Sequence, residues 1–146
     1  QRLLAEAADR RARPLPADAA ALIESYVAVK AQAHAAVDEV AKLAHRHGVD
    51  LSAGLDAFAR RLDLIEQAGV STAEAQFSAE FGRNLDYYTG FVFEAVAPAL
   101  GPRSPVAGGG RYDNLLAEVG APVSVPAVGV SIHTERLLAA LQEAAR

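Results

Sequence analysis

The chain has 146 residues, a formal net charge of −4 and a pI near 5.5, which argues against a surface that coats nucleic-acid phosphates, so no DNA partner is expected. It contains no cysteine, which excludes disulfides and thiolate metal sites and suits a reducing cytoplasm. No apolar run approaches the roughly 20 residues that span a bilayer, so no membrane partner is expected. Gln1 comes first and methionine is absent, and we therefore expect a fragment.

The first half of the chain is rich in alanine and predicts helices. Residues 1–9 predict a short helix. From Asp18 onward one long helix is predicted, because apolar residues recur at steps of three and four. These residues are Leu22, Tyr26, Val29, Ala33, Val37, Val40 and Ala44. Gly48 should form its left-handed C-cap. A second helix from Ser52, closed by Gly69, should lie antiparallel to the first.

Most of the glycines and prolines lie after residue 70, where the apolar period also changes. A strand is predicted from about Gln76, although residues 71–74 match a capping box and would also allow a helical turn. Alternation of apolar residues predicts a better strand over residues 91–97. The remaining predictions are a turn at 98–105, a short helix over 112–119, a buried strand over 125–132 and an amphipathic helix over 135–145.

The segment from Arg83 to Glu94 combines a guanidinium, a carboxylate and two phenols just before a strand. Arginine can hold a carboxylate bidentately, aspartate can accept an amine, and tyrosine hydroxyls can bind ring nitrogens. This composition indicates a site for a small cationic, aromatic or zwitterionic ligand. The alternative is a solvated strand entry whose tyrosines only pack.

Three other patterns could carry chemistry. Gly108, Gly109 and Gly110 could cradle a phosphate, but they match neither nucleotide-binding fingerprint, and a tight turn that needs positive φ is the preferred interpretation. The histidines at 34, 45 and 47 lack a recognisable ligand spacing, so solvated side chains and no metal are expected. Arg136 lies near the start of a helix, a position that favours an anionic partner for it.

Taken in order, three segments resemble the second half of a histidyl-tRNA synthetase catalytic core. Residues 83–94 resemble the histidine-binding signature Arg-Gly-Leu-Asp-Tyr-Tyr-Thr-Gly-x-Val-Phe-Glu. Residues 109–115 resemble the element Gly-Gly-Arg-Tyr-Asp-x-Leu, and residues 126–137 resemble class II motif 3. The resemblance implies an α+β fold: residues 76–146 would form the C-terminal part of a class II synthetase-like antiparallel sheet flanked by helices. Residues 1–75 would be a helical, insertion-like segment before it.

The resemblance also implies roles for individual residues. Arg83 would contact the carboxylate of histidine or of its adenylate. Tyr88 and Tyr112 would line the pocket for the imidazole and the amino acid, with Asp86 and Tyr87 supporting it. No cofactor is implied.

Two departures from active synthetases concern motif 3 and the end of the chain. Where those enzymes have Gly-Leu-Glu-Arg, this chain has His133, Thr134, Glu135 and Arg136. An imidazole at 133 would enter the space that the adenine ring uses, so His133 and Arg136 are expected to form a vestigial ATP site. The chain also ends soon after Arg136, without an anticodon-binding domain. Asn84 replaces a family glycine, a milder change because asparagine tolerates left-handed geometry.

Both departures favour the synthetase-like paralogues that serve as regulatory subunits of short-form ATP phosphoribosyltransferases. The expected function is non-catalytic: the protein would bind L-histidine and act allosterically on a small catalytic subunit in the first step of histidine biosynthesis. A homodimer of the full-length protein is expected. One alternative is a fragment of a true histidyl-tRNA synthetase that activates histidine with ATP. Another is a binding module that serves a different pathway, such as a kinase-linked sensor.

A partial sheet has consequences for the site. Only three or four strands can be predicted, so an open, apolar sheet edge is expected. Part of the pocket should come from the missing half of the core. We therefore expect the chain alone not to bind histidine tightly.

Overall fold

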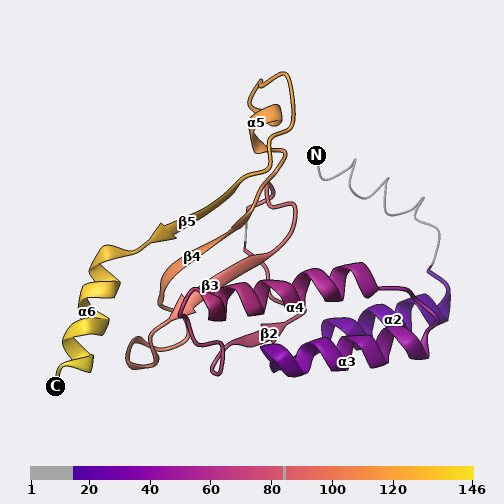
Figure 1. The fold of residues 1–146 in the computed structure, drawn as a ribbon, viewed down its shortest axis with the longest axis horizontal. Helices are drawn as coiled ribbons and strands as arrows, with labels where there is room; N and C mark the ends of the chain where they lie inside the picture. The colour runs from indigo at the N-terminus through magenta and orange to yellow at the C-terminus, as the bar shows by residue number, and fades with distance from the viewer. Residues whose placement is uncertain (1–14, 84) are drawn as a thin grey trace, which may run out of the picture. The chain divides into compact units, whose positions relative to one another are not determined.

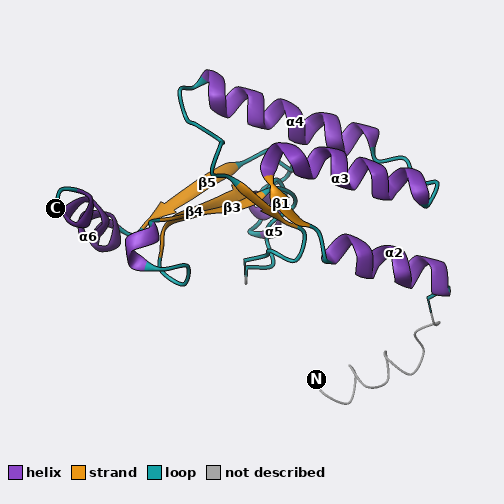
Figure 2. Ribbon diagram, turned by 90° about the horizontal axis from the view of Figure 1, so that it is seen from below, coloured by secondary structure: helices purple, strands orange, loops and turns teal. Residues whose placement is uncertain are grey.

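The computed structural model describes residues 15–83 and 85–146. Its elements are helices and two antiparallel sheets, which confirms the predicted α+β class (Figures 1 and 2). The chain divides into two compact units, Gln1–Phe81 and Gly82–Arg146, and each is described by itself below. The helix predicted over residues 1–9 lies outside the described residues.

The first unit contains helices α2 (Ala17–Val27), α3 (Ala33–Arg46) and α4 (Ser52–Gln67). The prediction of one long helix from Asp18 is wrong, because strand β1 (Lys30–Gln32) interrupts it. β1 pairs antiparallel with β2 (Gln76–Ser78), a partner more than 40 residues away that no local periodicity reveals.

The side chain of Gln32 then starts α3 as a separate helix. Its oxygen accepts hydrogen bonds from the backbone amides of His34 and Ala35, which would otherwise have no partner within the helix. The strand predicted from Gln76 is confirmed, although it is only three residues long. A turn precedes it, closed by a hydrogen bond from the Ala75 amide to the Thr72 carbonyl.

Helices α3 and α4 lie side by side (Figures 1 and 2). His34 at the start of α3 contacts Glu66 at the end of α4, so the two helices run antiparallel, as predicted. Gly48 and Gly69 follow the two helices with φ of 64° and 83°, which confirms the left-handed helix ends. Within the described residues, the buried hydrophobic side chains are few, mostly small, and all in this unit: Ala33, Ala36, Val40, Leu43, Ala44 and Leu62.

The second unit is built on a three-stranded antiparallel sheet in the order β3-β4-β5. Its strands are β3 (Val92–Val96), β4 (Pro105–Arg111) and β5 (Val128–Ile132). A 3-10 turn, η1 (Pro98–Leu100), follows β3, the short helix α5 (Leu115–Glu118) follows β4, and α6 (Thr134–Ala144) follows β5. These elements confirm the predicted strand over 91–97 and both predicted helices. In Figure 1, α5 and α6 lie beyond opposite ends of the sheet.

Two predictions for this unit are wrong. Gly108, Gly109 and Gly110 do not form a turn, because they are buried in the middle of the central strand β4 and none has a positive φ. β5 is not a buried strand: within the described residues it is an edge strand of the sheet, as β3 is on the other side. Its Val128, Val130 and Ile132 are 77%, 58% and 54% exposed. The described sheet therefore has the open, apolar edge that was expected.

Candidate functional site

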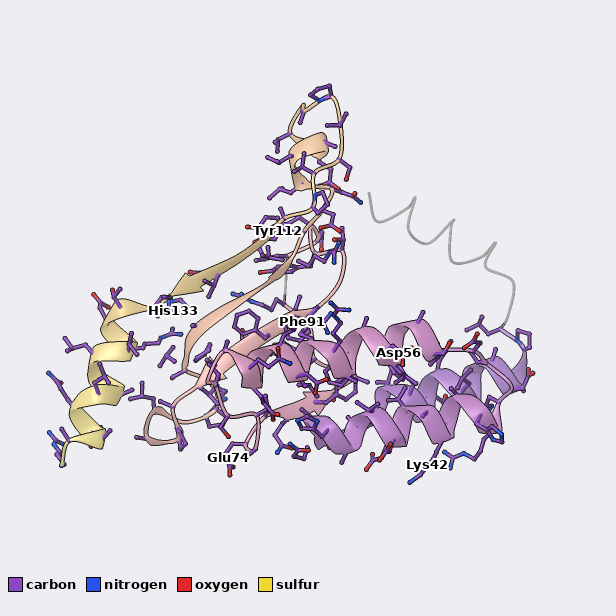
Figure 3. The ribbon with its side chains drawn as sticks, viewed as in Figure 1. Lys42, Asp56, Glu74, Phe91, Tyr112 and His133 are labelled. Atoms are coloured by element: carbon purple, nitrogen blue, oxygen red, sulfur yellow. The ribbon has the colours of Figure 1, made fainter. Side chains whose placement is uncertain are left out.

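Three tyrosines of the second unit form one aromatic cluster. Tyr87 and Tyr88 come from the loop that enters β3. Tyr112, labelled in Figure 3, directly follows β4. The ring centroids of Tyr87 and Tyr88 are 4.7 Å apart, and Tyr112 lies 5.5 Å from Tyr87 with its ring edge-on. The structure thus brings together tyrosines that are 24 residues apart in the chain.

Arg83 joins this cluster from the start of the same loop. Its Nη1 donates a hydrogen bond to the Tyr88 hydroxyl at 3.3 Å, and its Cζ lies 5.9 Å from the centre of the Tyr88 ring. Its Nε lies 3.6 Å from Oε1 of Glu94 on β3. The side chains of Arg83 and Glu94 are 18% and 29% exposed. Sequence reasoning did not single out Glu94, although a carboxylate in an otherwise apolar strand was a usable signal.

The cluster lies on strand segments that have no side chains. A Cβ on Gly108 would stand 2.8 Å from Nη1 of Arg83, and a Cβ on Gly110 would stand 2.8 Å from Cε1 of Tyr88. At Gly110 the added Cβ would also stand 2.6 Å from the backbone oxygen of Phe91, so this position needs glycine for space and not for backbone conformation. At Gly108 the nearest atoms belong to the end of the Arg83 side chain, which a Cβ would push away from its place. This close approach of other groups explains the glycines for which a turn was predicted.

Gly129 of β5 has the same role for the third tyrosine. It pairs directly with Gly110 in the sheet register, and a Cβ there would overlap the Tyr112 hydroxyl. We call Gly108, Gly110 and Gly129 the glycine floor. The sequence alone does not identify Gly129, because its role depends on the pairing of β4 with β5.

Two ionisable groups of this region, Tyr87 and Asp113, have shifted pKa values. A hydrogen bond with Tyr88, together with desolvation, raises the pKa of Tyr87. The Arg111 guanidinium, 2.7 Å from Asp113, lowers the pKa of that carboxyl group. Asp113 also accepts a hydrogen bond from the Ala127 amide, and its own amide donates to the Thr89 hydroxyl. Asp113, the residue after Tyr112, therefore connects the end of β4 to the segment before β3, through Thr89, and to the segment before β5, through Ala127.

The other predicted site residues lie elsewhere. Asp86 is exposed in the loop between Arg83 and Tyr87, and Asn84 lies outside the described residues. His133 is the exposed residue before α6, and Arg136 donates a hydrogen bond to the Pro105 carbonyl at 3.0 Å. Pro105 begins β4, whereas Tyr112 follows its last residue, Arg111. His133 and Arg136 therefore lie toward the opposite end of the strand from the tyrosines (Figure 3).

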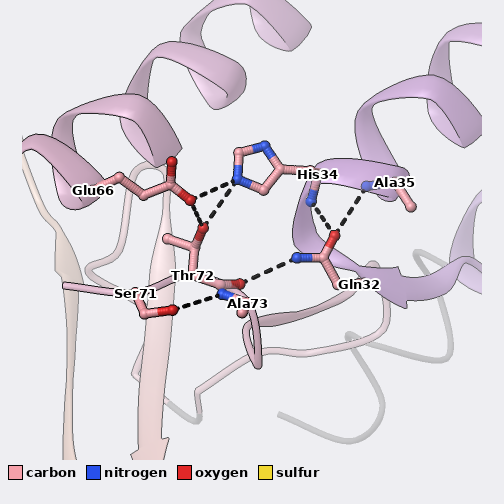
Figure 4. A network of polar contacts seen from close by, with 7 residues as sticks. All are labelled: Gln32, His34, Ala35, Glu66, Ser71, Thr72 and Ala73. Atoms are coloured by element: carbon pink, nitrogen blue, oxygen red, sulfur yellow. Dashed lines mark hydrogen bonds and ion pairs between the residues drawn. The ribbon is translucent and has the colours of Figure 1, made fainter.

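The first unit holds a second polar cluster, which Figure 4 shows. Nε2 of His34 lies 3.0 Å from Oε1 of Glu66 and 2.9 Å from the hydroxyl of Thr72. The Thr72 hydroxyl, which is almost fully buried, donates to the same Glu66 oxygen. These contacts lower the pKa of Glu66, the Thr72 bond more than the His34 bond. The cluster joins the start of α3, the end of α4 and the following loop, and it is structural in character.

No candidate metal site is found in residues 15–83 and 85–146. They contain no group of three or more His, Asp or Glu side chains placed to ligate one. None of the described helices combines the length and apolar character that crossing a membrane requires.

Comparison with known proteins places these features in a family. The family model described as Histidyl-tRNA synthetase matches residues 2–137. The ATP phosphoribosyltransferase regulatory subunit of Brucella anthropi is 40% identical over 136 residues, which are 93% of this chain and 36% of that protein. The protein of the same name from Mesorhizobium japonicum is 40% identical over 144 residues, 99% of this chain and 38% of that protein.

A solved structure agrees with these relatives. The crystal structure of a histidine–tRNA ligase subunit from Alicyclobacillus acidocaldarius is 35% identical, with a TM-score of 0.58. The match covers 77% of this chain and 34% of that chain. This chain thus spans little more than a third of the length of the curated relatives it matches. Because the family model covers most of its residues, the chain belongs to the histidyl-tRNA synthetase family.

Proposed function

We propose that the chain is part of a regulatory subunit of ATP phosphoribosyltransferase, a protein without aminoacylation activity that binds L-histidine. Histidine would occupy the face of the glycine floor, next to Arg83 and the three tyrosines. Its binding would shift the equilibrium between two states of an assembly with a short catalytic subunit.

The observation that carries this proposal is the convergence of Arg83, Tyr87, Tyr88 and Tyr112 on one bare sheet face. A guanidinium suits the carboxylate of an amino acid, and tyrosine hydroxyls can bind ring nitrogens as donors or acceptors. The relatives named as regulatory subunits match nearly the whole chain, which supports this branch of the family.

Asp86 would support the amino group of the ligand from the loop that carries the tyrosines. It is exposed in this structure, so its carboxylate would have to turn toward the ligand on binding. Arg136 and His133 would be the remnant of an ATP site. An imidazole at 133 would occupy the space of the adenine ring, and Arg136, bonded to the Pro105 carbonyl, would bind no phosphate.

The partners follow from the same proposal. The intact protein would form a homodimer and a hetero-oligomer with the short catalytic subunit, and it would work in the cytoplasm on the first step of histidine biosynthesis. Co-purification of the intact protein with a short phosphoribosyltransferase tests this arrangement. Purification of the intact protein without that partner, from cells that produce both, would contradict it.

Histidine binding can be tested by calorimetry on the intact protein. We expect saturable binding of L-histidine and no binding of an amino acid without a ring nitrogen, such as leucine. The absence of any heat with histidine at millimolar concentration would refute the proposed ligand.

The second candidate is a true histidyl-tRNA synthetase, which the matching family model and the similar ligase subunit structure favour. In that case Arg83 would assist adenylation. ATP–pyrophosphate exchange that depends on histidine separates the two functions. Robust exchange would establish the synthetase, and its absence together with histidine binding would support the regulatory subunit.

A further inference from the structure

The guanidinium of Arg83 is held by two long contacts. Its Nε–Oε1 distance to Glu94 is 3.6 Å, and its hydrogen bond to the Tyr88 hydroxyl is 3.3 Å. A charge-assisted hydrogen bond between a guanidinium and a carboxylate is typically about 2.7–2.9 Å. Arg83 is therefore paired in charge, but neither of these contacts is a tight, directional bond.

Glu94 is placed to be the counter-ion of Arg83 by the sheet register. It lies opposite Gly108 in the pairing of β3 with β4. A Cβ at Gly108 would stand 2.8 Å from Nη1 of Arg83 and 3.1 Å from Cγ of Glu94. Both side chains thus share the space above one glycine, on the face that carries the tyrosines.

Because Arg83 and Glu94 are partly buried, the electrostatic interaction between them is stronger than it would be on the surface. With exposed fractions of 18% and 29%, the two side chains are less screened by water than a surface ion pair. A second carboxylate that approached Arg83 would meet both the attraction of the guanidinium and the repulsion of Glu94. The two carboxylates would compete for one cation.

We propose that Glu94 is the resident counter-ion of Arg83 and that the carboxylate of an incoming amino acid displaces it. This inference rests on the proposed histidine site and assigns Glu94 a specificity-determining role in it. Glu94 lowers the affinity for ligands with a free carboxylate and leaves ligands without one unaffected. Half-saturation of the site with histidine therefore requires a higher histidine concentration than it would without the charge of Glu94.

The test compares two ligands in the intact protein with and without the charge on residue 94. The ligands are L-histidine and histidinol, in which a hydroxymethyl group replaces the carboxylate, and their affinities are measured by calorimetry and NMR titration. In Glu94→Gln we expect histidine to bind about fivefold more tightly and histidinol to bind unchanged. Glu94→Asp, which keeps the charge, should return histidine affinity toward that of the wild type.

Glu118→Gln is the matched control, because Glu118 is an exposed carboxylate at the end of α5 in the same unit. It should alter neither affinity. A purely structural role of Glu94 would change both ligands equally, and that outcome would overturn the inference. Weaker histidine binding in Glu94→Gln would overturn it as well.

A measurement without ligand separates this inference from the proposed function. A double-mutant cycle of Arg83→Gln and Glu94→Gln in chemical unfolding should show a favourable coupling between the two side chains. Zero coupling would refute the counter-ion role even where histidine binds. Conversely, a wild-type protein that shows the coupling but binds no histidine refutes the proposed function, and the ligand-displacement role with it.

Discussion

The ring of Tyr88 lies directly against the backbone of Gly110: a Cβ at that glycine would stand 2.8 Å from Cε1 of the ring. The same Cβ would stand 2.6 Å from the carbonyl oxygen of Phe91, which accepts the ladder hydrogen bond of Arg111. Position 110 is therefore closed to any side chain by an aromatic ring on one side and by the neighbouring strand on the other.

Gly110→Ala should consequently destabilise the protein. Forcing a methyl group into a packed site typically costs about 1–3 kcal/mol, because the neighbours must shift. Gly54→Ala is the matched control: Gly54 lies in α4, where a Cβ would meet nothing within 4 Å. The control should stabilise the protein by about 0.5–1 kcal/mol through helix propensity. Denaturant unfolding measures both, and an unchanged stability in Gly110→Ala would contradict the packing.

Arg83→Ala should weaken histidine binding by about 2–5 kcal/mol, because the ligand carboxylate would lose a partly buried partner. Arg103→Ala, at an exposed arginine in the turn before β4, should leave the affinity unchanged. Calorimetry on the intact protein measures both. An affinity that survives the loss of the Arg83 guanidinium would remove this residue from the site.

Tyr88→Phe tests the phenol that Arg83 contacts. It keeps the ring on Gly110 and removes only the hydroxyl that accepts the hydrogen bond from Arg83. Histidine binding should weaken by about 0.5–1.5 kcal/mol, the usual net contribution of one hydrogen bond. Tyr26→Phe, on the exposed surface of α2, is the control and should have no effect. Equal affinities for the wild type and Tyr88→Phe would show that the Tyr88 hydroxyl does not contribute.

Leu62→Ala should cost about 2–5 kcal/mol of unfolding free energy, because Leu62 is a buried leucine of α4, only 4% exposed. Leu64→Ala, two residues further along the same helix and 52% exposed, should have a small effect. Thermal and denaturant unfolding compare the two variants. Equal losses would mean that α4 does not bury the face assigned to it.

Glu66 should contribute to the acid sensitivity of the protein. Its pKa is lowered in the fold from an ordinary value of 4.5, first by the hydroxyl of Thr72 and then by His34. The carboxylate therefore stabilises the fold above that ordinary value, and this contribution disappears as the pH falls through the lowered pKa. Stability should thus fall less steeply below pH 4.5 in Glu66→Gln than in the wild type.

Thr72→Val tests the cause of this pKa shift, because it removes the hydroxyl and keeps the shape of the buried side chain. The pKa of Glu66, followed by NMR titration, should rise toward its ordinary value. Glu74→Gln, in the same loop, changes a carboxylate outside this cluster and should leave the pKa of Glu66 unchanged. A pKa of Glu66 that stays low in Thr72→Val would assign the shift to His34 instead.

Much of the secondary structure was predictable, because it follows from local periods. The spacing of apolar residues located α4, α5, α6 and β3, and glycine located the left-handed ends at Gly48 and Gly69. Arg83, Tyr88 and Tyr112 were also predicted as neighbours in one site, since they belong to motifs that resemble known ones. The structure brings these three side chains together.

Long-range pairing could not be predicted in the same way. The helical period runs through residues 30–32, yet β2 recruits this segment into a two-stranded sheet and breaks the helix there. The apolar residues of β5 predicted a buried strand, yet Val128, Val130 and Ile132 are exposed. Side chains stand perpendicular to a sheet, and no described residue covers this face of β5.

The glycines of β4 show the same limit at the site. Three consecutive glycines predict a turn when only the local backbone is considered, because glycine adopts positive φ easily. Hydrogen bonding to β3 and β5 instead makes them the centre of a sheet, and the missing Cβ atoms leave room for Arg83 and Tyr88. Local chemistry selects which elements form, but contacts between distant segments determine which atoms must be absent.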